Sequence, residues 1–230
     1  MARAPRLALA GELHYLLQLG HNGQPAFIDD GDRETYLAML REAAMQYRVA
    51  VHAYAVLDSE VHLLATPGEP DALSRVMQSL GRRYVSGFNR RHARSGTLWQ
   101  GRFRAALIDG EALGHDATLQ VELQPVTTGL AGAAGEWPWS SAAHHLGQRR
   151  DPLITEHTSY WSLGNTPFER EHVHALRLQE GLLPATARRV ERAVLQGRPV
   201  GPAPFLGRIE GRTGRPLQVK PRGRPARLSK

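Results

Sequence analysis

The segment that decides the fold is residues 49–65, which read VAVHAYAVLDSEVHLLA. Residues 49–57 are rich in β-branched and aromatic side chains, and residues 61–65 form a second apolar run, as is typical of strands. Asp58 and Ser59 separate the two runs and are residues that favour turns. The segment therefore predicts a β-hairpin.

The sequence on both sides of the hairpin predicts the remaining elements. Upstream, residues 13–19 (LHYLLQL) indicate a buried strand, and apolar residues then recur at helical spacing from 36 to 47. Downstream, the pattern predicts a helix over 71–92, a strand over 98–108 and a helix over 109–124. The order β-α-β-β-α-β-α predicts an α+β protein with the ferredoxin-like split βαβ fold, an antiparallel sheet with helices on one face.

The pattern loosens beyond residue 147, which suggests a division of the chain. We expect a main domain at residues 1–147 and a helical C-terminal appendage at 148–210, with helices over 167–180 and 185–196. Residues 211–230 are rich in Gly, Pro, Arg and Lys and have little to bury, so they predict a disordered basic tail.

The charge balance indicates an anionic partner. Lys and Arg outnumber Asp and Glu by 29 to 22, and the sequence pI is near 10.3, as in proteins that bind nucleic acid or a membrane surface. The chain has no cysteine, which excludes disulfides and thiolate zinc sites. No apolar run approaches the roughly 20 residues that span a bilayer, so we expect a cytoplasmic protein without a membrane partner.

The basic residues are concentrated in two stretches without acids. The first, between Ala72 and Ile108, contains eight arginines that could neutralise phosphates. Trp99 could stack on an unpaired base, whereas the spacing of Phe88 and Phe103 favours core packing. The predicted DNA-binding residues of this stretch are Arg75, Arg82, Arg83, Arg90, Arg91, Arg94, Trp99, Arg102 and Arg104.

The second acid-free stretch is the tail, residues 211–230. Its pentapeptide 221–225, PRGRP, resembles the core of an AT-hook, in which an extended Arg-Gly-Arg lies in the narrow minor groove of A·T tracts. Arg222 and Arg224 are therefore also predicted to bind DNA. A tail that binds phosphates without preference explains the same composition.

Several segments resemble the REP-associated tyrosine transposases and their insertion-sequence relatives, single-strand DNA transposases of the HUH class. The resemblance covers roughly residues 5–147 and includes GHN at 20–22, FIDD at 27–30, HAYAVL at 52–57, FNRRH at 88–92, WQGRF at 99–103 and PWSS at 138–141. It implies a ferredoxin-like fold and hairpin or single-stranded repeat DNA as partner. It also implies a divalent metal that polarises the scissile phosphate and a tyrosine nucleophile.

Two positions depart from the family pattern. The His-hydrophobic-His motif, aligned on the surrounding leucines, here reads Glu60-Val61-His62, so a glutamate replaces the first histidine. Glu60 and His62 still share one sheet face, and a carboxylate with an imidazole is suited to Mg²⁺ or Mn²⁺. Gln120 stands where the tyrosine belongs, and Gln124 stands one turn later, where relatives can place an amide that completes the metal shell. The resemblance thus implies Glu60, His62 and Gln124 as metal ligands and assigns no nucleophile.

Three functions follow as hypotheses, and whether the chain is an enzyme stays open among them. The first is a DNA-binding protein of the transposase family, acting in DNA transposition, with impaired or lost strand cleavage. The second is a working metal-dependent single-strand nuclease, in which water or a displaced tyrosine such as Tyr54 or Tyr84 attacks the phosphate. The third is a ferredoxin-like module that binds a protein or small ligand. Relatives include monomers and dimers that exchange the tyrosine helix, so we expect a monomer or a homodimer. The histidines at 144, 145, 172 and 174 show no partner set, and most are expected at the surface.

Overall fold

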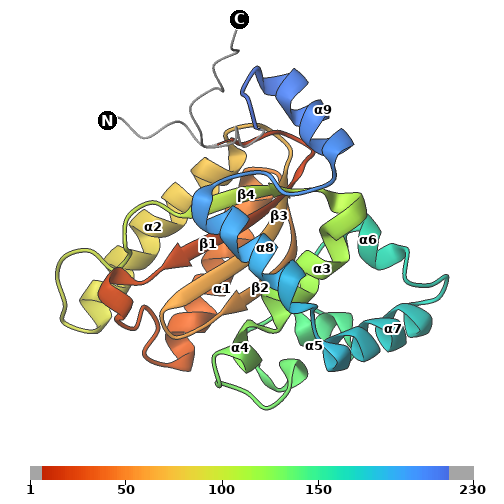
Figure 1. The fold of residues 1–230 in the computed structure, drawn as a ribbon. Coiled ribbons are helices and arrows are strands. Elements are labelled where there is room, and N and C mark those ends of the chain that lie inside the picture. The colour runs from red at the N-terminus through yellow and green to blue at the C-terminus, as the bar shows by residue number, and fades with distance from the viewer. Residues whose placement is uncertain (1–6, 218–230) are drawn as a thin grey trace, which may run out of the picture.

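A computed structural model describes residues 7–217. Its centre is a four-stranded antiparallel sheet in the order β2-β3-β1-β4 (Figure 1). The strands are β1 (Leu13–Leu19), β2 (Val49–Val56), β3 (Glu60–Pro67) and β4 (Arg104–Ile108). This order is the ferredoxin-like one, which confirms the predicted α+β class.

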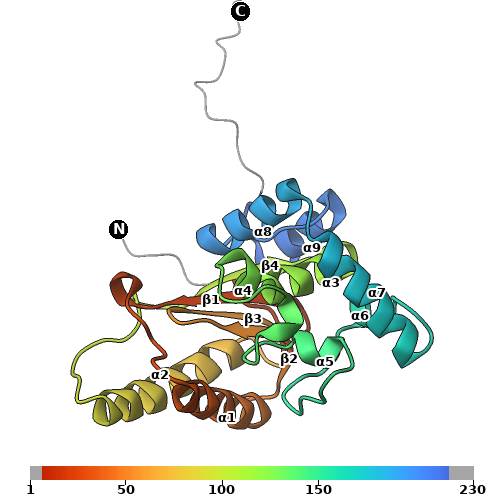
Figure 2. The same cartoon turned by 90° about the horizontal axis from the view of Figure 1, so that it is seen from below.

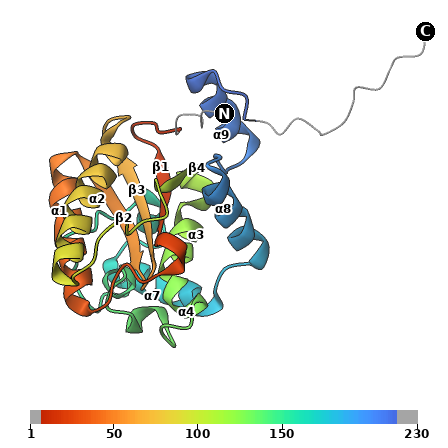
Figure 3. The same ribbon diagram turned by 90° about the vertical axis from the view of Figure 1, so that its left-hand side faces the viewer.

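Helices α1 (Asp30–Gln46) and α2 (Ala72–Arg91) lie side by side on one face of the sheet (Figures 2 and 3). The core on this side joins strand residues such as Leu16 and Leu63 to Tyr36, Leu40 and Leu80 of the two helices. The side chain of Asp29 accepts a hydrogen bond from Asp32 N and so caps the N-terminus of α1.

Helices α3 (Gly110–Glu122) and α8 (Pro184–Gln196) cover the opposite face (Figure 3). The predicted fold class is confirmed, with α1 and α2 on one face, and α3 and α8 add a helical layer on the other face that the predicted one-face arrangement did not include. The physical reason is visible in β1 and β2, where almost every residue is buried, so that neither face can be left to water. Leu17, Leu64 and Ile108 pack there against Ala117 of α3 and Val190 of α8.

The strand predicted over 98–108 begins only at Arg104. Residues 98–100 instead run beside the end of β1, where Trp99 forms an isolated bridge with Gly20 and Gln100 N donates to Leu19 O. Leu19 is paired on its other side with Glu60. The α2–β4 loop, residues 92–103, therefore reaches the same end of the sheet as Glu60.

The remaining helices of the described residues are η1 (His21–Gly23), α4 (Gln124–Thr127), η2 (Ala134–Glu136), α5 (Ala142–His145), α6 (Thr158–Trp161), α7 (Pro167–Glu180) and α9 (Ala203–Thr213). The predicted helices over 167–180 and 185–196 correspond to α7 and α8. Helix α9 was not predicted. It packs Phe205 and Ile209 on Leu107, and its arginines Arg208 and Arg212 both contact Glu12.

Helix α9 extends over the first three residues of the predicted tail, whereas Arg222 and Arg224 lie outside the described residues. Within residues 7–217, none of the helices combines the length and apolarity needed to cross a lipid bilayer.

Candidate functional site

The predicted acid–imidazole pair is present on β3. His62 Nε2 lies 3.1 Å from Glu60 Oε2, and the hydroxyl of Tyr15 on β1 lies 2.9 Å from His62 Nδ1. Both side chains belong to the sheet face that α3 and α8 cover, because strand residues alternate between faces. His62 is buried, whereas the Glu60 side chain is 37% exposed, so the pair opens to solvent through its carboxylate.

Electrostatics connect this pair to two residues that the sequence did not indicate. The hydrogen bond from His62 holds the pKa of Glu60 below its ordinary value, although burial opposes the shift. Burial raises the pKa of the Tyr15 hydroxyl, and the charges of Glu60 and of Glu191 on α8 raise it further. Tyr15 therefore stays a neutral hydroxyl that orients His62, and α8 borders the site. Only the strand register, in which Leu17 faces His62, could have placed Tyr15 beside the pair.

The two glutamines of the predicted site lie on and just beyond α3. Gln120 follows Leu113 and Ala117 by seven and three residues, which places it on the helix face that packs on the sheet. Its Oε1 is buried without a hydrogen-bond partner among the described residues. The Gln124 amide donates to Gln120 O at 2.9 Å and makes no hydrogen bond to Glu60 or His62 within residues 7–217. The structure thus joins Glu60 to His62 but does not bring Gln124 into contact with them.

A second cluster is fully buried and combines Glu122, His145 and His174 from α3, α5 and α7. His145 Nδ1 lies 2.6 Å from Glu122 Oε1, and His174 Nε2 lies 2.8 Å from Glu122 Oε2. Ser141 Oγ also donates to the carboxylate, and His115 Nε2 lies 3.0 Å from His174 Nδ1. The expectation of surface histidines is therefore wrong for His145 and His174, because they satisfy a carboxylate that lies 23 and 52 residues away along the chain.

This Glu/His/His group could bind a metal. Its present spacing is that of hydrogen bonds, since two ligands of one tetrahedral zinc at about 2.0–2.1 Å would stand roughly 3.3 Å apart. Burial alone would raise the pKa of Glu122, but His145 and His174 hold it well below its ordinary value. The group in this state is a charged hydrogen-bond network that ties three helices together.

A third cluster, Asp29, Asp32 and His92, already contains its own cation. Arg91 donates to Asp29 and Asp32 at 2.6–2.8 Å, and His92 Nε2 lies 2.9 Å from Asp32 Oδ2. The guanidinium neutralises the two carboxylates.

Three of the eight arginines in the first acid-free stretch lie beside carboxylates from other parts of the chain. Arg75 lies 3.6 Å from Glu69 and Arg83 lies 2.6 Å from Glu42, in addition to the contacts of Arg91. The acids come from α1 and from the segment before α2, which a linear count of charges could not show. Five predicted DNA-binding arginines have no carboxylate partner in the part of the chain that the structure describes: Arg82, Arg90, Arg94, Arg102 and Arg104.

Arg104, the last arginine of this stretch, lies in one row of the sheet with Leu17 and His62. Directly opposed residues of antiparallel strands point to the same face, so Arg104 shares the face of the Glu60–His62 pair. Its guanidinium donates to Leu195 O near the end of α8 at 3.4 Å.

Trp99 is 6% exposed and packs with Phe27, Tyr36 and Tyr84. Its ring faces are used in the core, so it is not placed to stack on a base as expected. Phe88 and Phe103 are also in the core, in agreement with their spacing.

The tyrosines leave no exposed nucleophile beside His62. Five of the six are at most 4% exposed: Tyr15, Tyr36, Tyr54, Tyr84 and Tyr160. The sixth, Tyr47, follows α1 on the opposite side of the sheet, under Arg75. Tyr84 donates to Ala26 O at 2.8 Å.

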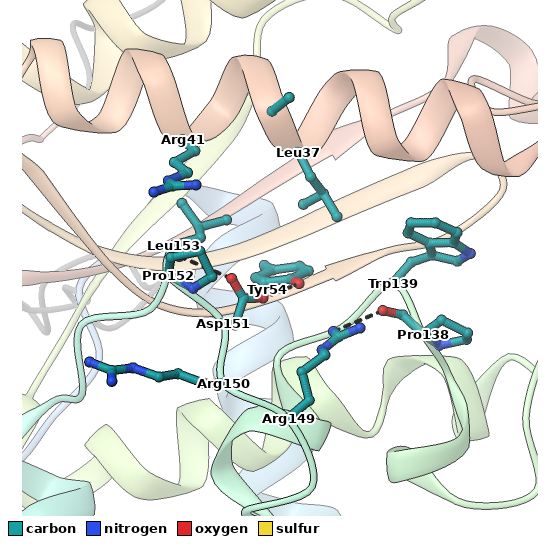
Figure 4. Close-up of a pocket in the computed structure, with 11 residues that line it drawn as sticks. Leu37, Arg41, Tyr54, Pro138, Trp139, Arg149, Arg150, Asp151, Pro152 and Leu153 are labelled. Carbon is teal, nitrogen blue, oxygen red and sulfur yellow. Dashed lines mark hydrogen bonds between the residues drawn. The ribbon is translucent and has the colours of Figure 1, made fainter.

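Tyr54 borders a cavity of about 310 Å³ at the β2 edge of the sheet, between α1 and the 149–153 segment (Figure 4). Its hydroxyl donates to Asp151 Oδ2 at 2.6 Å, on the face turned away from His62. The same cavity is lined by Arg41, Trp139 and Arg150. Neither Tyr54 nor Tyr84 thus lies at the Glu60–His62 pair.

A β2-β3-β1-β4 sheet, with two helices on one face and an acid–imidazole pair beside α3 on the other, defines an α+β protein of ferredoxin-like topology. No protein-family model and no curated protein matches the chain. Among solved structures, it is similar to a REP-associated tyrosine transposase bound to a REP hairpin, with 16% identity and a TM-score of 0.56 over 67% of this chain and 91% of the other.

A putative transposase from Deinococcus radiodurans is also similar, with 22% identity and a TM-score of 0.35 over 45% of this chain and 84% of the other. At 16% sequence identity, the similarity to the REP-associated transposase concerns the fold. The resemblance read from the motifs is confirmed at that level.

Proposed function

We propose that this chain is a DNA-binding protein of the transposase type that recognises hairpin or single-stranded repeat DNA and has lost tyrosine-dependent strand cleavage. The observation that carries the proposal is that no tyrosine is placed as an exposed nucleophile at the Glu60–His62 pair. Position 120 holds an amide, which cannot form a phosphotyrosine. Tyr15, the one tyrosine in contact with His62, is 3% exposed and bonded to that imidazole.

The proposed DNA partner is supported by the placement of the free arginines. Arg90, Arg94 and Arg102 lie at the C-terminal end of α2 and in the α2–β4 loop, which reaches the end of the sheet that carries Glu60. Exposed guanidinium groups neutralise phosphates and release counterions. A REP hairpin is the ligand of the similar transposase structure, and we extend that class of ligand to this chain.

We further propose that Glu60 and His62 hold Mg²⁺ or Mn²⁺, which would supply Lewis-acid polarisation of a phosphate. Oxygen and imidazole donors suit these ions, and both tolerate a site completed by water. His62 Nε2 would then turn from Glu60 to the metal, and Nδ1–H would donate to the Tyr15 oxygen. Gln124 could become a third metal ligand only if its amide gave up the hydrogen bond to Gln120 O.

The Glu60–His62 pair also favours a second candidate function, a metal-dependent nuclease in which water attacks the phosphate. On that account hairpin DNA is nicked in Mn²⁺ and His62→Ala abolishes the nicking. If the proposed loss of cleavage is correct, the wild type and His62→Ala both bind the hairpin DNA and neither protein cuts it. A third candidate, a ferredoxin-like module for protein or small ligands, predicts no DNA affinity that depends on salt.

Filter binding of a labelled hairpin across 50–200 mM KCl tests the proposed ligand. We expect affinity to fall steeply with salt, by about 0.9 in log K per log salt for each phosphate contacted. A weak affinity that does not change with salt would contradict DNA as the ligand. The cytoplasmic location and the monomeric or homodimeric state remain predictions, and light scattering with and without DNA tests the latter.

A further inference from the structure

We infer that α8 and the segment leading to α9 form a second DNA-backbone site, which contacts the phosphates of a strand beside the Glu60–His62 pair. The site is a hollow of about 460 Å³, here called the α8 hollow, outside the region of the family resemblance. This inference rests on the proposed DNA binding and adds a surface to it. The charged residues that line the hollow are Arg188, Arg189, Arg192 and Arg198.

The sequence of α8 arranges these arginines in one stripe. Ala185, Arg188, Arg189, Arg192 and Gln196 recur at i, i+3, i+4, i+7 and i+11, which is one face of a helix. Val190 and Val194, on another face, are buried against the sheet and hold the helix in place. The stripe therefore stays at the surface because the apolar face of α8 fixes its rotation.

The hollow contains no compensating charge, since none of the residues that line it is acidic. Arg189 donates to Gly201 O at 2.7 Å, which is a neutral acceptor. In the described part of the chain, Arg188, Arg192 and Arg198 have no carboxylate within ion-pair distance. Clustered guanidinium groups repel one another, and a bound anion removes that repulsion.

The shape of the cluster favours a polyanion over a single small anion. From Arg188 to Arg192 the helix rises roughly 6 Å at 1.5 Å per residue, and Arg198 follows the C-terminal end of α8, so the charges are spread along the hollow. DNA presents phosphates in a line, and the planar guanidinium fork matches phosphate oxygens in pairs.

The position of α8 connects the α8 hollow to the candidate site. Near the end of α8, Leu195 O accepts the hydrogen bond from Arg104, which lies in one row with His62. Val190 and Val194 of the same helix pack in the core cluster that contains Tyr15, the residue bonded to His62. Helix α8 therefore borders the α8 hollow and also packs on the sheet face that carries the Glu60–His62 pair.

The test is a fluorescence anisotropy titration of a labelled DNA hairpin with the full chain between 50 and 200 mM KCl. We expect Arg188→Ala/Arg192→Ala to weaken binding about tenfold at 100 mM KCl and to reduce the salt slope by about 2, as for two lost phosphate contacts. The matched control is Arg41→Ala/Arg150→Ala, which removes two exposed arginines from the β2-edge cavity and should stay within about twofold of the wild type. Alanine favours helix, so the α8 variant should fold, as circular dichroism will show.

The outcomes separate the two proposals. If the wild type does not bind the hairpin, the proposed function fails. If the wild type binds and the α8 variant keeps the same dependence of affinity on salt, the α8 hollow is not the site and DNA binding stands. The same conclusion follows if the control variant loses as much affinity as the α8 variant. Arg188→Lys/Arg192→Lys should keep the slope, because the charge remains. Stabilisation by inorganic phosphate that the α8 variant lacks, with no change in DNA binding, would also overturn the inference.

Discussion

Glu60 and Gln120 occupy the positions at which the family resemblance implies a metal-binding histidine and a nucleophilic tyrosine. The sequence was sufficient to locate both, because each is fixed by a neighbouring motif. It could not show that Gln120 faces the sheet, or that Tyr15 holds His62 from the other ring nitrogen at 2.9 Å. Those facts depend on strand register and helix rotation, which are set by packing over the whole domain.

Restoring both residues should restore cleavage. We expect Glu60→His/Gln120→Tyr to form a covalent adduct with single-stranded repeat DNA in Mn²⁺, because a tyrosine on this helix face would approach the metal pair. The adduct is detected as a slow band on a denaturing gel. Glu60→His/Gln120→Phe is the matched control and should give none. If the tyrosine variant folds, binds DNA and forms no adduct, the assignment of position 120 is incorrect.

Glu122 should dominate the stability of the second half of the chain. In Glu122→Gln an amide replaces a buried carboxylate that accepts from His145, His174 and Ser141, so at least one donor loses its acceptor. We expect the free energy of unfolding in urea to fall by about 3 kcal/mol. Glu171→Gln, a change at a less buried glutamate, should cost little. A loss below about 0.5 kcal/mol for Glu122→Gln would show that the network is not formed.

At the scale of elements, apolar pattern located β1 and the β2–β3 hairpin well. It failed at residues 98–103, where Trp99 enters an aromatic cluster and the chain is a loop. It also missed α9, whose sequence contains Gly207 and Gly211, which disfavour helix. Contacts of Phe205 and Ile209 with Leu107 override that weak local preference.

The C-terminal end of α2 and the α2–β4 loop should contribute to DNA affinity through their arginines without carboxylate partners. We expect Arg90→Ala/Arg102→Ala to weaken hairpin binding roughly tenfold at 100 mM salt, as for two phosphate contacts. The control Arg75→Ala/Arg83→Ala removes equal charge, but these arginines already lie beside Glu69 and Glu42. Its effect should be clearly smaller in the same titration. Equal losses would mean that net charge alone, without placement, determines the affinity.

At the scale of the whole molecule, the two helical layers bury histidines, and this predicts a response to acid. Burial lowers the pKa of His14, His52 and His115 from 6.5 to about 4. Because the unfolded chain binds these protons more tightly, their contribution to stability is complete above pH 6.5 and is lost as the pH falls towards 4.

Urea unfolding at pH 7.0, 5.5 and 4.5 measures this loss, which can reach about 2 kcal/mol for each histidine over this range. His52→Gln should make the dependence shallower, whereas His172→Gln, at an exposed position, should leave it unchanged. A stability that is constant from pH 7 to 4.5 would contradict the burial of neutral histidines.

The proposed function requires that this protein binds DNA and lacks tyrosine-dependent cleavage. One incubation of wild-type protein with Mn²⁺ and an end-labelled hairpin that carries single-stranded flanks tests both parts. The sample is divided between a native and a denaturing gel. We expect a retarded band on the native gel and intact, unattached DNA on the denaturing gel. A covalent protein–DNA band, or the absence of any retarded band, would contradict it.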